Sequence, residues 1–394
     1  MLRILQFIIA LLLLIGLEVL RVYFIMPFPG SQRSESIDIA YFLHQNIVWF
    51  RWIGWLMIAY PVFYFFIYGN TRTKWLTGIV LGFYLYVFFL FNYRFLADKM
   101  FLQIKQKTFV EAKNNSVPAN NLVLGISING ESKAYPIEII GYHHQVRDTV
   151  GREPVMVTYC TVCRTGRVFS PQVEGRWETF RLVGMDHFNA MFEDSGTQTW
   201  WRQVNGEAIA GPLKGQTLKE IPAEQMSLRA WLELHPDSKI LQPDTTYNEH
   251  YEGLKDFDEG TIQSGLEHRD SLSWKEKSWV VGVQLGTQAR AYDWNELLTQ
   301  HVINDTLSKT PIAIAVDGDS LSFYVWKRDT LEFSWDESRR MIRDKQTQSW
   351  WNARGVSIEG SLTGSRLQGI QSYQEFWHSW KTFRPHSTQY KASE

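Results

Sequence analysis

Cys160 and Cys163 are the only cysteines in the sequence, and two residues separate them in the stretch TYCTVCRTG. Thiols at this spacing can close a disulfide or present two sulfur atoms to one metal ion. A secreted fold held together by disulfides needs more cysteines than this pair. We therefore expect a local redox couple, part of a metal site, or two inert core thiols.

Histidine and methionine residues near the pair offer the further donor atoms that a metal site needs. His143 and His144 lie upstream in GYHHQVRDTVG, and Met185, His187 and Met191 lie downstream in GMDHFNAMF. Cysteine combined with histidine or methionine suits copper, especially the cuprous ion, and zinc is less favoured because a structural zinc site takes four Cys or His ligands. The alternative is that each histidine is a surface or capping residue and each methionine a core residue.

The residues after the pair predict a hairpin turn. In thioredoxin-like proteins such a pair lies at the amino terminus of a helix, where the helix dipole stabilises a thiolate. Here Arg164-Thr165-Gly166 form a turn into a strand that continues through Arg167. This favours a sulfur-bearing hairpin, as in metal-binding knuckles, and the two arginines could lower the thiol pKa values.

The segments that position the pair recur further along the chain. VLGISINGESKAYPIEII resembles VVGVQLGTQARAYDWNELL, and the starting residues differ by 280 − 123 = 157 positions. Two later matches keep the same order. The three pairs begin at Val123 and Val280, at Asp194 (DSGTQTWW) and Asp344 (DKQTQSWW), and at Ile209 (IAGPLKGQTLKEI) and Ile358 (IEGSLTGSRLQGI). The sequence thus predicts two tandem homologous units.

The second copy lacks the cysteines. Asp317 occupies the position of Cys160, and Ser320 that of Cys163. The fold therefore does not require the thiols, which favours a functional role for them in the first copy.

Local patterns predict a β-rich α+β fold. Alternating apolar residues followed by Asn129-Gly130 indicate a hairpin. We expect helices at 136–144 and 223–234, and a strand that ends at Cys160. The alternating strand–helix series of a doubly wound sheet is missing, and no sheet order is predicted.

The first hundred residues predict three transmembrane helices, at about 4–26, 48–68 and 75–95, each long enough to cross a bilayer. No small-residue cleavage site follows the first, so we expect a retained anchor and not a signal peptide. Arg3, Arg72 and Lys74 place the amino terminus in the cytoplasm, which leaves the carboxyl-terminal domain periplasmic in a bacterial inner membrane. Basic residues from Arg94 onward argue the other way.

Net charge limits the kinds of partner to expect, and the positions of the apolar segments and the repeats indicate the domain layout. The 394 residues carry a net charge of −1, which argues against nucleic-acid binding. The lipid bilayer is an expected partner, with other membrane or envelope proteins as further candidates. The expected layout is 1–96 membrane region, 97–120 linker, 121–240 first repeat, 241–275 connector and 276–394 second repeat.

The stretch AYPIEIIGYHHQVRDTVGREPVMVTYCTVCRTGRVF, at residues 134–169, resembles the signature of the domain of unknown function 3179 family of bacteria and archaea. The later methionine-bearing stretch, the TQTW motif and GEAIAGPLKG follow in the family order. The resemblance implies that the family histidine is His143, its cysteines are Cys160 and Cys163, and its methionine is Met191. Four departures stand out: His144 for an acidic residue, Arg147 for Asn, Thr161-Val162 for Pro-Leu, and Arg164 for Gly.

Our leading hypothesis is a copper-binding protein in metal handling or electron transfer, with Cys160, Cys163, His143 and Met191 as ligands and His144, His187 and Met185 as weaker candidates. The second is a thiol–disulfide exchange module in which Cys160 and Cys163 are the redox-active residues; a related version makes Cys160 a nucleophile with His143 as its base. The third is a non-catalytic assembly module of a membrane complex. Whether the protein is an enzyme is left open.

Overall fold

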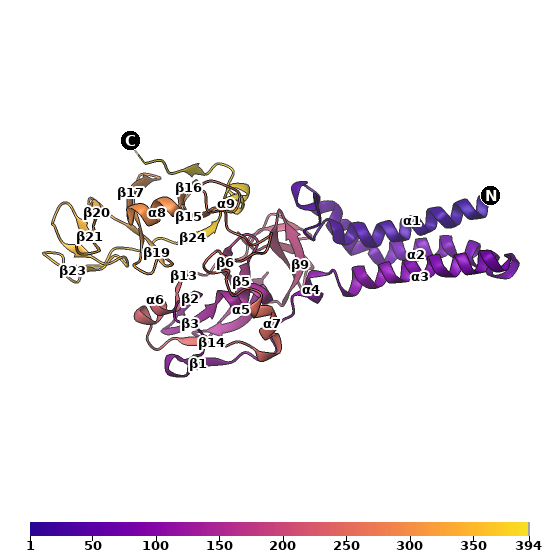
Figure 1. Cartoon of the computed structure of the whole chain (residues 1–394), viewed down its shortest axis with the longest axis horizontal. Helices are drawn as coiled ribbons and strands as arrows, with labels where there is room; N and C mark the ends of the chain where they lie inside the picture. Colours follow the sequence, from indigo (N-terminus) through magenta and orange to yellow (C-terminus); the bar gives the residue numbers. More distant parts are fainter. Residues whose placement is uncertain (393–394) are drawn as a thin grey trace. The chain divides into compact units, whose positions relative to one another are not determined.

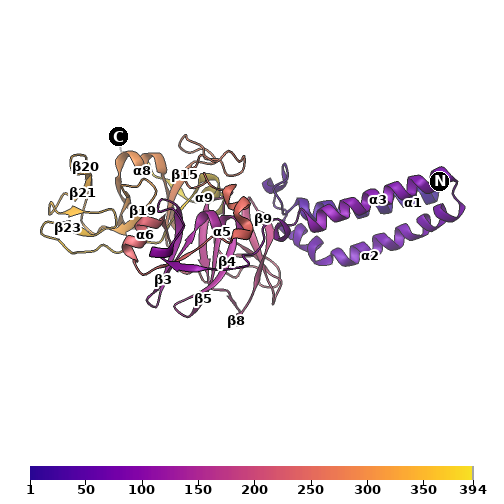
Figure 2. The ribbon, with the colours of Figure 1, turned by 60° about the horizontal axis from the view of Figure 1, so that its bottom comes forward.

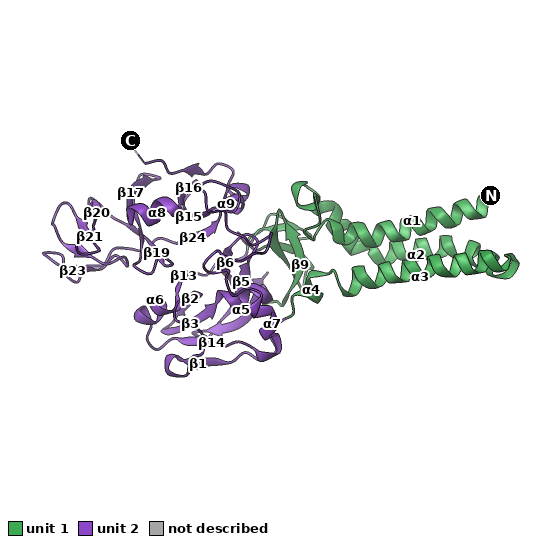
Figure 3. Cartoon of the chain, viewed as in Figure 1, with its two compact units in different colours: residues 1–102, 176–202, 207–217 green, residues 103–175, 203–206, 218–394 purple. Residues whose placement is uncertain are grey.

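The structure is a computed structural model that describes residues 1–392 (Figure 1). It divides into two compact units (Figure 3). Unit 1 comprises residues 1–102, 176–202 and 207–217, and unit 2 comprises residues 103–175, 203–206 and the chain from Leu218 onward. These units differ from the predicted repeat boundaries, which stay a prediction, and residues 393–394 of the predicted second repeat lie outside the described residues.

Three long apolar helices open the chain, as predicted. They are α1 (Leu2–Tyr23), α2 (Ile37–Tyr68) and α3 (Thr71–Tyr93), and each is long and apolar enough to cross a membrane. Figure 2 shows them side by side. Helix α2 begins well before the predicted start at residue 48, because the more polar segment 37–47 is helical too. Asn70 caps α3 by accepting a hydrogen bond from the Thr73 amide at 2.9 Å.

The outer surface of the helices is apolar. Trp49, Trp52 and Leu56 of α2 are 70%, 61% and 72% exposed, whereas Leu14 of α1 is fully buried against Gly54 of α2. Helices with large apolar side chains on their outer faces are typical of lipid-embedded segments.

Unit 1 also contains an antiparallel sheet in the order β12-β11-β10-β9. The Met185 amide donates to the Ile25 carbonyl at 2.7 Å, and the Tyr41 hydroxyl donates to the Gln198 carbonyl at 3.2 Å. These bonds attach the sheet to the helical region. The remaining elements of unit 1 are η1 (Ser31–Arg33), α4 (Ala97–Met100), β8 (Arg176–Trp177), β9 (Phe180–Asp186), β10 (Asn189–Asp194), β11 (Trp200–Arg202) and β12 (Ala208–Ala210).

Unit 2 begins with two sheets, in the orders β1-β14-β3-β2-β13 and β4-β5-β6. The predicted hairpin at Asn129-Gly130 joins β2 to β3, and both turn residues have positive φ. The elements are β1 (Phe109–Glu111), η2 (Ala112–Asn114), β2 (Leu122–Ile128), β3 (Glu131–Pro136), α5 (Ile137–His143), β4 (Gln145–Val150), β5 (Glu153–Cys160), β6 (Thr165–Phe169), β7 (Gln172–Val173), β13 (Glu224–Ser227), α6 (Leu228–Leu234), β14 (Lys239–Leu241), η3 (Thr245–Tyr247) and α7 (Asn248–Glu252).

The rest of unit 2 contains three sheets, in the orders β24-β15-β16-β25, β17-β18-β19 and β20-β21-β22-β23. The second and third have the strand orders of the sheets β4-β5-β6 and β9-β10-β11-β12, and the first matches four of the five strands in the sheet β1-β14-β3-β2-β13. The elements are β15 (Trp279–Leu285), β16 (Gln288–Asp293), α8 (Trp294–Gln300), β17 (Val302–Leu307), β18 (Thr310–Val316), β19 (Phe323–Lys327), β20 (Phe333–Asp336), β21 (Met341–Asp344), β22 (Trp350–Trp351), β23 (Ser357–Glu359), β24 (Ser372–Phe376), α9 (Trp377–Phe383) and β25 (Thr388–Gln389).

A buried tryptophan packs on a glycine at equivalent places in the two sets of sheets. Trp231 of α6 covers Gly125 of β2, and Trp380 of α9 covers Gly282 of β15. A β-carbon at either glycine would overlap the indole ring, so both positions require glycine for close packing.

The helix predicted at 223–234 is shorter than expected. Its first part is strand β13, because Glu224–Ser227 pair with β2, and α6 begins only at Leu228. Ser227 then caps the helix by accepting a hydrogen bond from the Ala230 amide at 3.1 Å. Pairing with a neighbouring strand thus overrides local helix propensity.

Candidate functional site

The two cysteines lie on the hairpin between β5 and β6, as the sequence predicted. Cys160 is the last residue of β5 and pairs with Thr165, the first residue of β6. The turn is closed by a hydrogen bond from the Arg164 amide to the Thr161 carbonyl at 3.2 Å. The hairpin therefore brings both sulfur-bearing residues to one end of a three-stranded sheet.

Arg164 holds the turn in an uncommon backbone conformation. Its φ is 55°, in the left-handed region that glycine adopts without strain, and the family pattern has glycine here. The buried guanidinium donates to the Phe257 carbonyl at 3.2 Å, the Asp258 carbonyl at 3.3 Å and Gln374 Oε1 at 3.0 Å. It also stacks 3.7 Å above the Trp279 ring. These contacts compensate the strain at the turn.

Both cysteines are thiols and are fully buried. The two side chains are hydrogen-bonded to each other. Burial raises the pKa of the Cys163 thiol well above its ordinary value, the bond to Cys160 raises it further, and the Lys277 ammonium opposes both effects. Cys163 is therefore protonated at neutral pH, which makes it a poor nucleophile but leaves two sulfur atoms in contact.

Residues from the carboxyl-terminal part of unit 2 clamp this hairpin. The Phe376 amide donates to the Cys163 carbonyl at 3.0 Å, and Lys277 Nζ donates to the Val162 carbonyl at 2.9 Å. His378 Nε2 donates to the same carbonyl at 3.1 Å. Burial, together with the Lys277 charge, lowers the pKa of His378 to about 3, so the ring is neutral.

Ser379 connects Cys163 to a buried ion pair. Its side chain is hydrogen-bonded to the Cys163 sulfur, and its hydroxyl donates to Glu375 Oε2 at 3.0 Å. Glu375 forms a buried ion pair with Arg167. The bond to Ser379 lowers the pKa of the Cys163 thiol, against the larger effect of burial.

His143 and His144 end helix α5 and are both buried. His143 Nε2 is hydrogen-bonded to the Tyr251 hydroxyl at 2.6 Å. His144 has a φ of 59°, and burial lowers its pKa to about 4, so it is a neutral residue that terminates the helix. These contacts give each histidine a structural role beside its predicted role as a ligand.

The other three predicted ligands belong to unit 1. Met185 lies in β9, Met191 lies in β10, and His187 lies in the turn between them. His187 Nδ1 is bonded to Asp186 Oδ1 at 2.6 Å, and this bond raises the pKa of the imidazole. The predicted ligands are thus divided between the units, with Cys160, Cys163, His143 and His144 in unit 2.

Among residues 1–392, no group of three or more His, Cys, Asp and Glu side chains is arranged to hold a metal ion. Of the predicted donors in unit 2, Cys160 and Cys163 share one hairpin turn. Two sulfur atoms do not make up the four-ligand set of structural zinc.

Sequence patterns alone did not identify the clamp. Lys277, Phe376 and Ser379 are more than 110 positions from Cys163, and none belongs to a recognisable motif. The nearest signal in the sequence is the predicted internal repeat, which by itself specifies no contact between its two parts.

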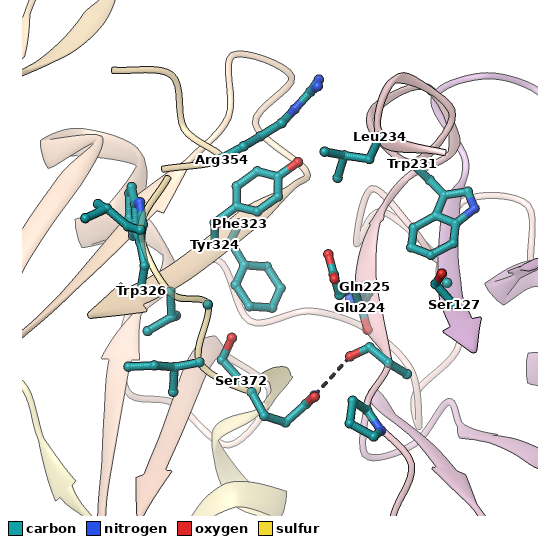
Figure 4. Close-up of a pocket in the computed structure, with 18 of the residues that line it drawn as sticks. Ser127, Glu224, Gln225, Trp231, Leu234, Phe323, Tyr324, Trp326, Arg354 and Ser372 are labelled. Atoms are coloured by element: carbon teal, nitrogen blue, oxygen red, sulfur yellow. Dashed lines mark hydrogen bonds between the residues drawn. The ribbon is translucent and has the colours of Figure 1, made fainter. Parts of the chain in front are cut away.

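A groove of about 570 Å³ in unit 2 was also not predicted. Figure 4 shows Phe323 and Tyr324 on one side of it, Trp231 on the other, and Glu224 between them. The guanidinium of Arg354, which pairs with Glu233, lines one end. The groove combines aromatic rings with charges of both signs.

Comparison with known proteins gives a family and no described relative. The profile of the protein family of unknown function DUF3179 matches residues 102–387, which is 286 of the 394 residues. No curated protein and no solved structure matches the chain. The matched range includes the hairpin, its clamp and every sheet strand except β25. The chain therefore belongs to the DUF3179 family.

Proposed function

We propose that this chain is a membrane-tethered protein in which the Cys160–Cys163 pair binds a soft monovalent metal ion, with copper(I) favoured, for metal handling or electron transfer. The observation that carries the proposal is the pair of buried, mutually hydrogen-bonded thiols beside the Lys277 ammonium. Thiolate sulfur selects cuprous ions over harder metals.

The binding step balances without a further reactant. Copper(I) replaces the two thiol protons, two copper–sulfur bonds form, two protons leave, and no electron is transferred. The resulting group, [Cu(SR)₂]⁻, carries one negative charge. Lys277 supplies a positive charge against it.

The second repeat explains why the clamp exists. We infer that the β-rich region is a tandem duplication, because the strand orders β14-β3-β2-β13 and β4-β5-β6 recur as β25-β16-β15-β24 and β17-β18-β19. In this account the second copy lost the sulfur residues and kept the fold. Its last strand and helix, with Lys277, then came to enclose the hairpin of the first copy.

The membrane arrangement is part of the same proposal. The three helices α1, α2 and α3 cross a bacterial inner membrane, with the amino terminus in the cytoplasm and the β-rich region in the periplasm. Support comes from their length and composition and from Arg72 and Lys74 in the first turn of α3. A cysteine-labelling or protease-accessibility experiment on intact cells tests the orientation.

The experiment for the metal uses the full chain in detergent, prepared anaerobically and titrated with copper(I) against a chromogenic chelator. We expect one copper per chain in the wild type. The double variant Cys160→Ser, Cys163→Ser loses it. The matched control, Asp317→Asn with Ser320→Ala, changes the corresponding hairpin between β18 and β19 and should still bind one copper per chain. Unchanged stoichiometry in the serine variant would refute the proposal, and His143→Ala tests whether the imidazole contributes to affinity.

A reversible disulfide is the second candidate, favoured by the direct contact between the two thiols. Oxidation forms one sulfur–sulfur bond and releases two protons and two electrons to an oxidant such as diamide. Full burial and the raised pKa of Cys163 argue for slow exchange with other proteins. If diamide does not oxidise the two thiols and the chain binds no copper, the third hypothesis, a non-catalytic assembly module, would be favoured.

A further inference from the structure

A polar cluster lies inside the helical region of unit 1. Glu18 of α1 is fully buried, and Arg51 of α2 binds it through two bonds, Nε to Oε1 at 2.6 Å and Nη2 to Oε2 at 2.7 Å. Asn92 of α3 donates to Glu18 Oε2 at 2.9 Å. Each of the three helices therefore contributes to one hydrogen-bonded group.

A second arginine, Arg21, gives this cluster a net positive charge. Arg21 Nη2 and Arg51 Nη2 both donate to Asn92 Oδ1 at 2.6 Å, so the two guanidinium groups lie next to each other. Glu18 is 4.0 Å from Arg21 and is the one carboxylate in the cluster. Two positive charges and one negative charge leave an excess of one.

Neighbouring ionic groups do not remove this excess. Asp98 is 3.7 Å from Lys99, and Glu193 is 2.7 Å from Arg181, so each carboxylate has its own cation. A charge without a counterion is costly in apolar surroundings. The cluster therefore calls for an anion.

Donor groups for such an anion are present. Arg21 Nε is buried and has no hydrogen-bond partner within residues 1–392. The Arg51 side chain is 19% exposed, so the cluster is not fully enclosed by the helices. Trp49 and Trp52, within two positions of Arg51 along α2, are exposed and of the type found at the bilayer interface.

The cluster also lies at one end of the apolar segments. Glu18 and Arg21 are in the last turns of α1, Asn92 is in the last turn of α3, and Arg51 precedes the apolar stretch of α2 that runs to Tyr68. If these helices span a bilayer, the cluster lies at the level of the lipid headgroups on one side.

We propose that this cluster binds the phosphate group of an anionic phospholipid, with Arg21 and Arg51 as the donors. The proposal rests on the membrane placement proposed above and is independent of the metal site. A free phosphate ion offers the same chemistry, but the exposed tryptophans next to Arg51 in sequence, Trp49 and Trp52, favour a lipid headgroup. The structure thus assigns the excess charge to a bound headgroup.

The test uses the full chain in bilayer discs of phosphatidylcholine, with and without a minor fraction of phosphatidylglycerol. Native mass spectrometry counts retained lipids, and thermal unfolding is recorded for the same samples. We expect retained phosphatidylglycerol and a raised unfolding midpoint. Arg21→Gln should reduce the preference for phosphatidylglycerol about fivefold, which corresponds to about 1 kcal/mol for one basic side chain at a membrane surface.

Arg72→Gln, at the first turn of α3, is the matched control, and it should keep the full preference. If Arg21→Gln does not fold, Arg21→Lys keeps the charge without the planar fork and should give a weaker but measurable preference.

An equal preference in the wild type and Arg21→Gln would overturn the proposal. If inorganic phosphate stabilised the protein in pure phosphatidylcholine and phosphatidylglycerol had no effect, the bound group would be free phosphate and the lipid proposal would be wrong. Copper stoichiometry should be the same in Arg21→Gln and the wild type, which separates this test from that of the proposed function.

Discussion

Two hairpins of equal length occupy equivalent places in the β-rich region, and they differ in what surrounds them. In the first, Cys160 and Cys163 are fully buried beneath a clamp formed by Lys277 and β24 with α9. In the second, Asp317 donates its amide to the Ser322 carbonyl at 2.9 Å, and Ser320 is exposed. The second hairpin is held as well, because the Ser227 amide donates to Ser322 Oγ at 3.0 Å and the Ser227 hydroxyl donates to Asp319 Oδ2 at 2.7 Å. The comparison shows that both hairpins have the same strand register and both have a clamp, whereas full burial of the turn is found only where it carries the two sulfur atoms.

The largest effect that separates the two copies is expected at Arg167. Tyr324 is at the equivalent position, because Arg167 pairs with Thr158 between β6 and β5 and Tyr324 pairs with Ala315 between β19 and β18. Arg167→Met leaves the buried Glu375 carboxylate with the more distant cation Arg384, 3.7 Å away, and the neutral Ser379 hydroxyl, and should lower the free energy of unfolding by about 3 kcal/mol or more. Tyr324→Phe should change it by less than about 1 kcal/mol. Chemical denaturation of both variants measures the difference, and equal losses would show that the buried pair is not specific to the first copy.

A pH dependence should arise from Asp258, which lies beside the first hairpin alone. Burial raises its pKa to about 7, against the opposing effect of Arg164. A carboxyl group with a higher pKa in the folded chain stabilises the fold fully below its unfolded pKa, near 4, and this contribution is lost as the pH rises through 7. The loss is on the order of 1.4 kcal/mol for each pH unit between the two values.

Asp258→Asn should remove this slope. Unfolding midpoints between pH 4 and pH 8 measure it for the wild type and the variant. Parallel profiles would contradict the assignment to Asp258.

The two tryptophan–glycine contacts should behave alike. Gly125→Ala and Gly282→Ala each force a methyl group into an indole ring, and each should destabilise the fold by about 1–3 kcal/mol. Similar losses of stability, with copper binding retained in Gly282→Ala, would support the interpretation that the two sets of sheets share a fold and differ in chemistry. A loss of stability at only one of the two positions would contradict that interpretation.

The smallest expected effect concerns helix caps. Asp293 caps α8 by accepting a hydrogen bond from the Glu296 amide at 3.0 Å, whereas Pro136 at the equivalent place on α5 has no capping bond. Asp293→Ala should therefore cost about 1 kcal/mol, measured as a shift in the denaturation midpoint. An unchanged midpoint would mean that the capping bond contributes little to α8.

Local patterns predicted the elements near the cysteines well. The Asn129-Gly130 hairpin, the short helix α5, the strand ending at Cys160 and the three apolar helices all follow from residues close in sequence. Such features depend on turn chemistry and apolar periodicity, which a single sequence carries.

The surroundings of the cysteines could not be predicted in this way. Lys277 and Ser379 reach Cys163 through tertiary folding, and no local pattern encodes that contact. Strand β13 was predicted as helix because its pairing with β2 is also non-local. The polar cluster was not predicted either, because Glu18, Arg51 and Asn92 lie on three different helices and meet only through tertiary packing.

The central claim, a two-sulfur metal site in the first hairpin, is tested most directly by X-ray absorption at the copper edge of the loaded full-length protein. The account predicts a copper(I) ion whose first shell contains two sulfur atoms and no nitrogen, and its loss in the Cys160→Ser, Cys163→Ser variant. A shell of nitrogen or oxygen ligands, or the same spectrum from the double variant, would contradict it.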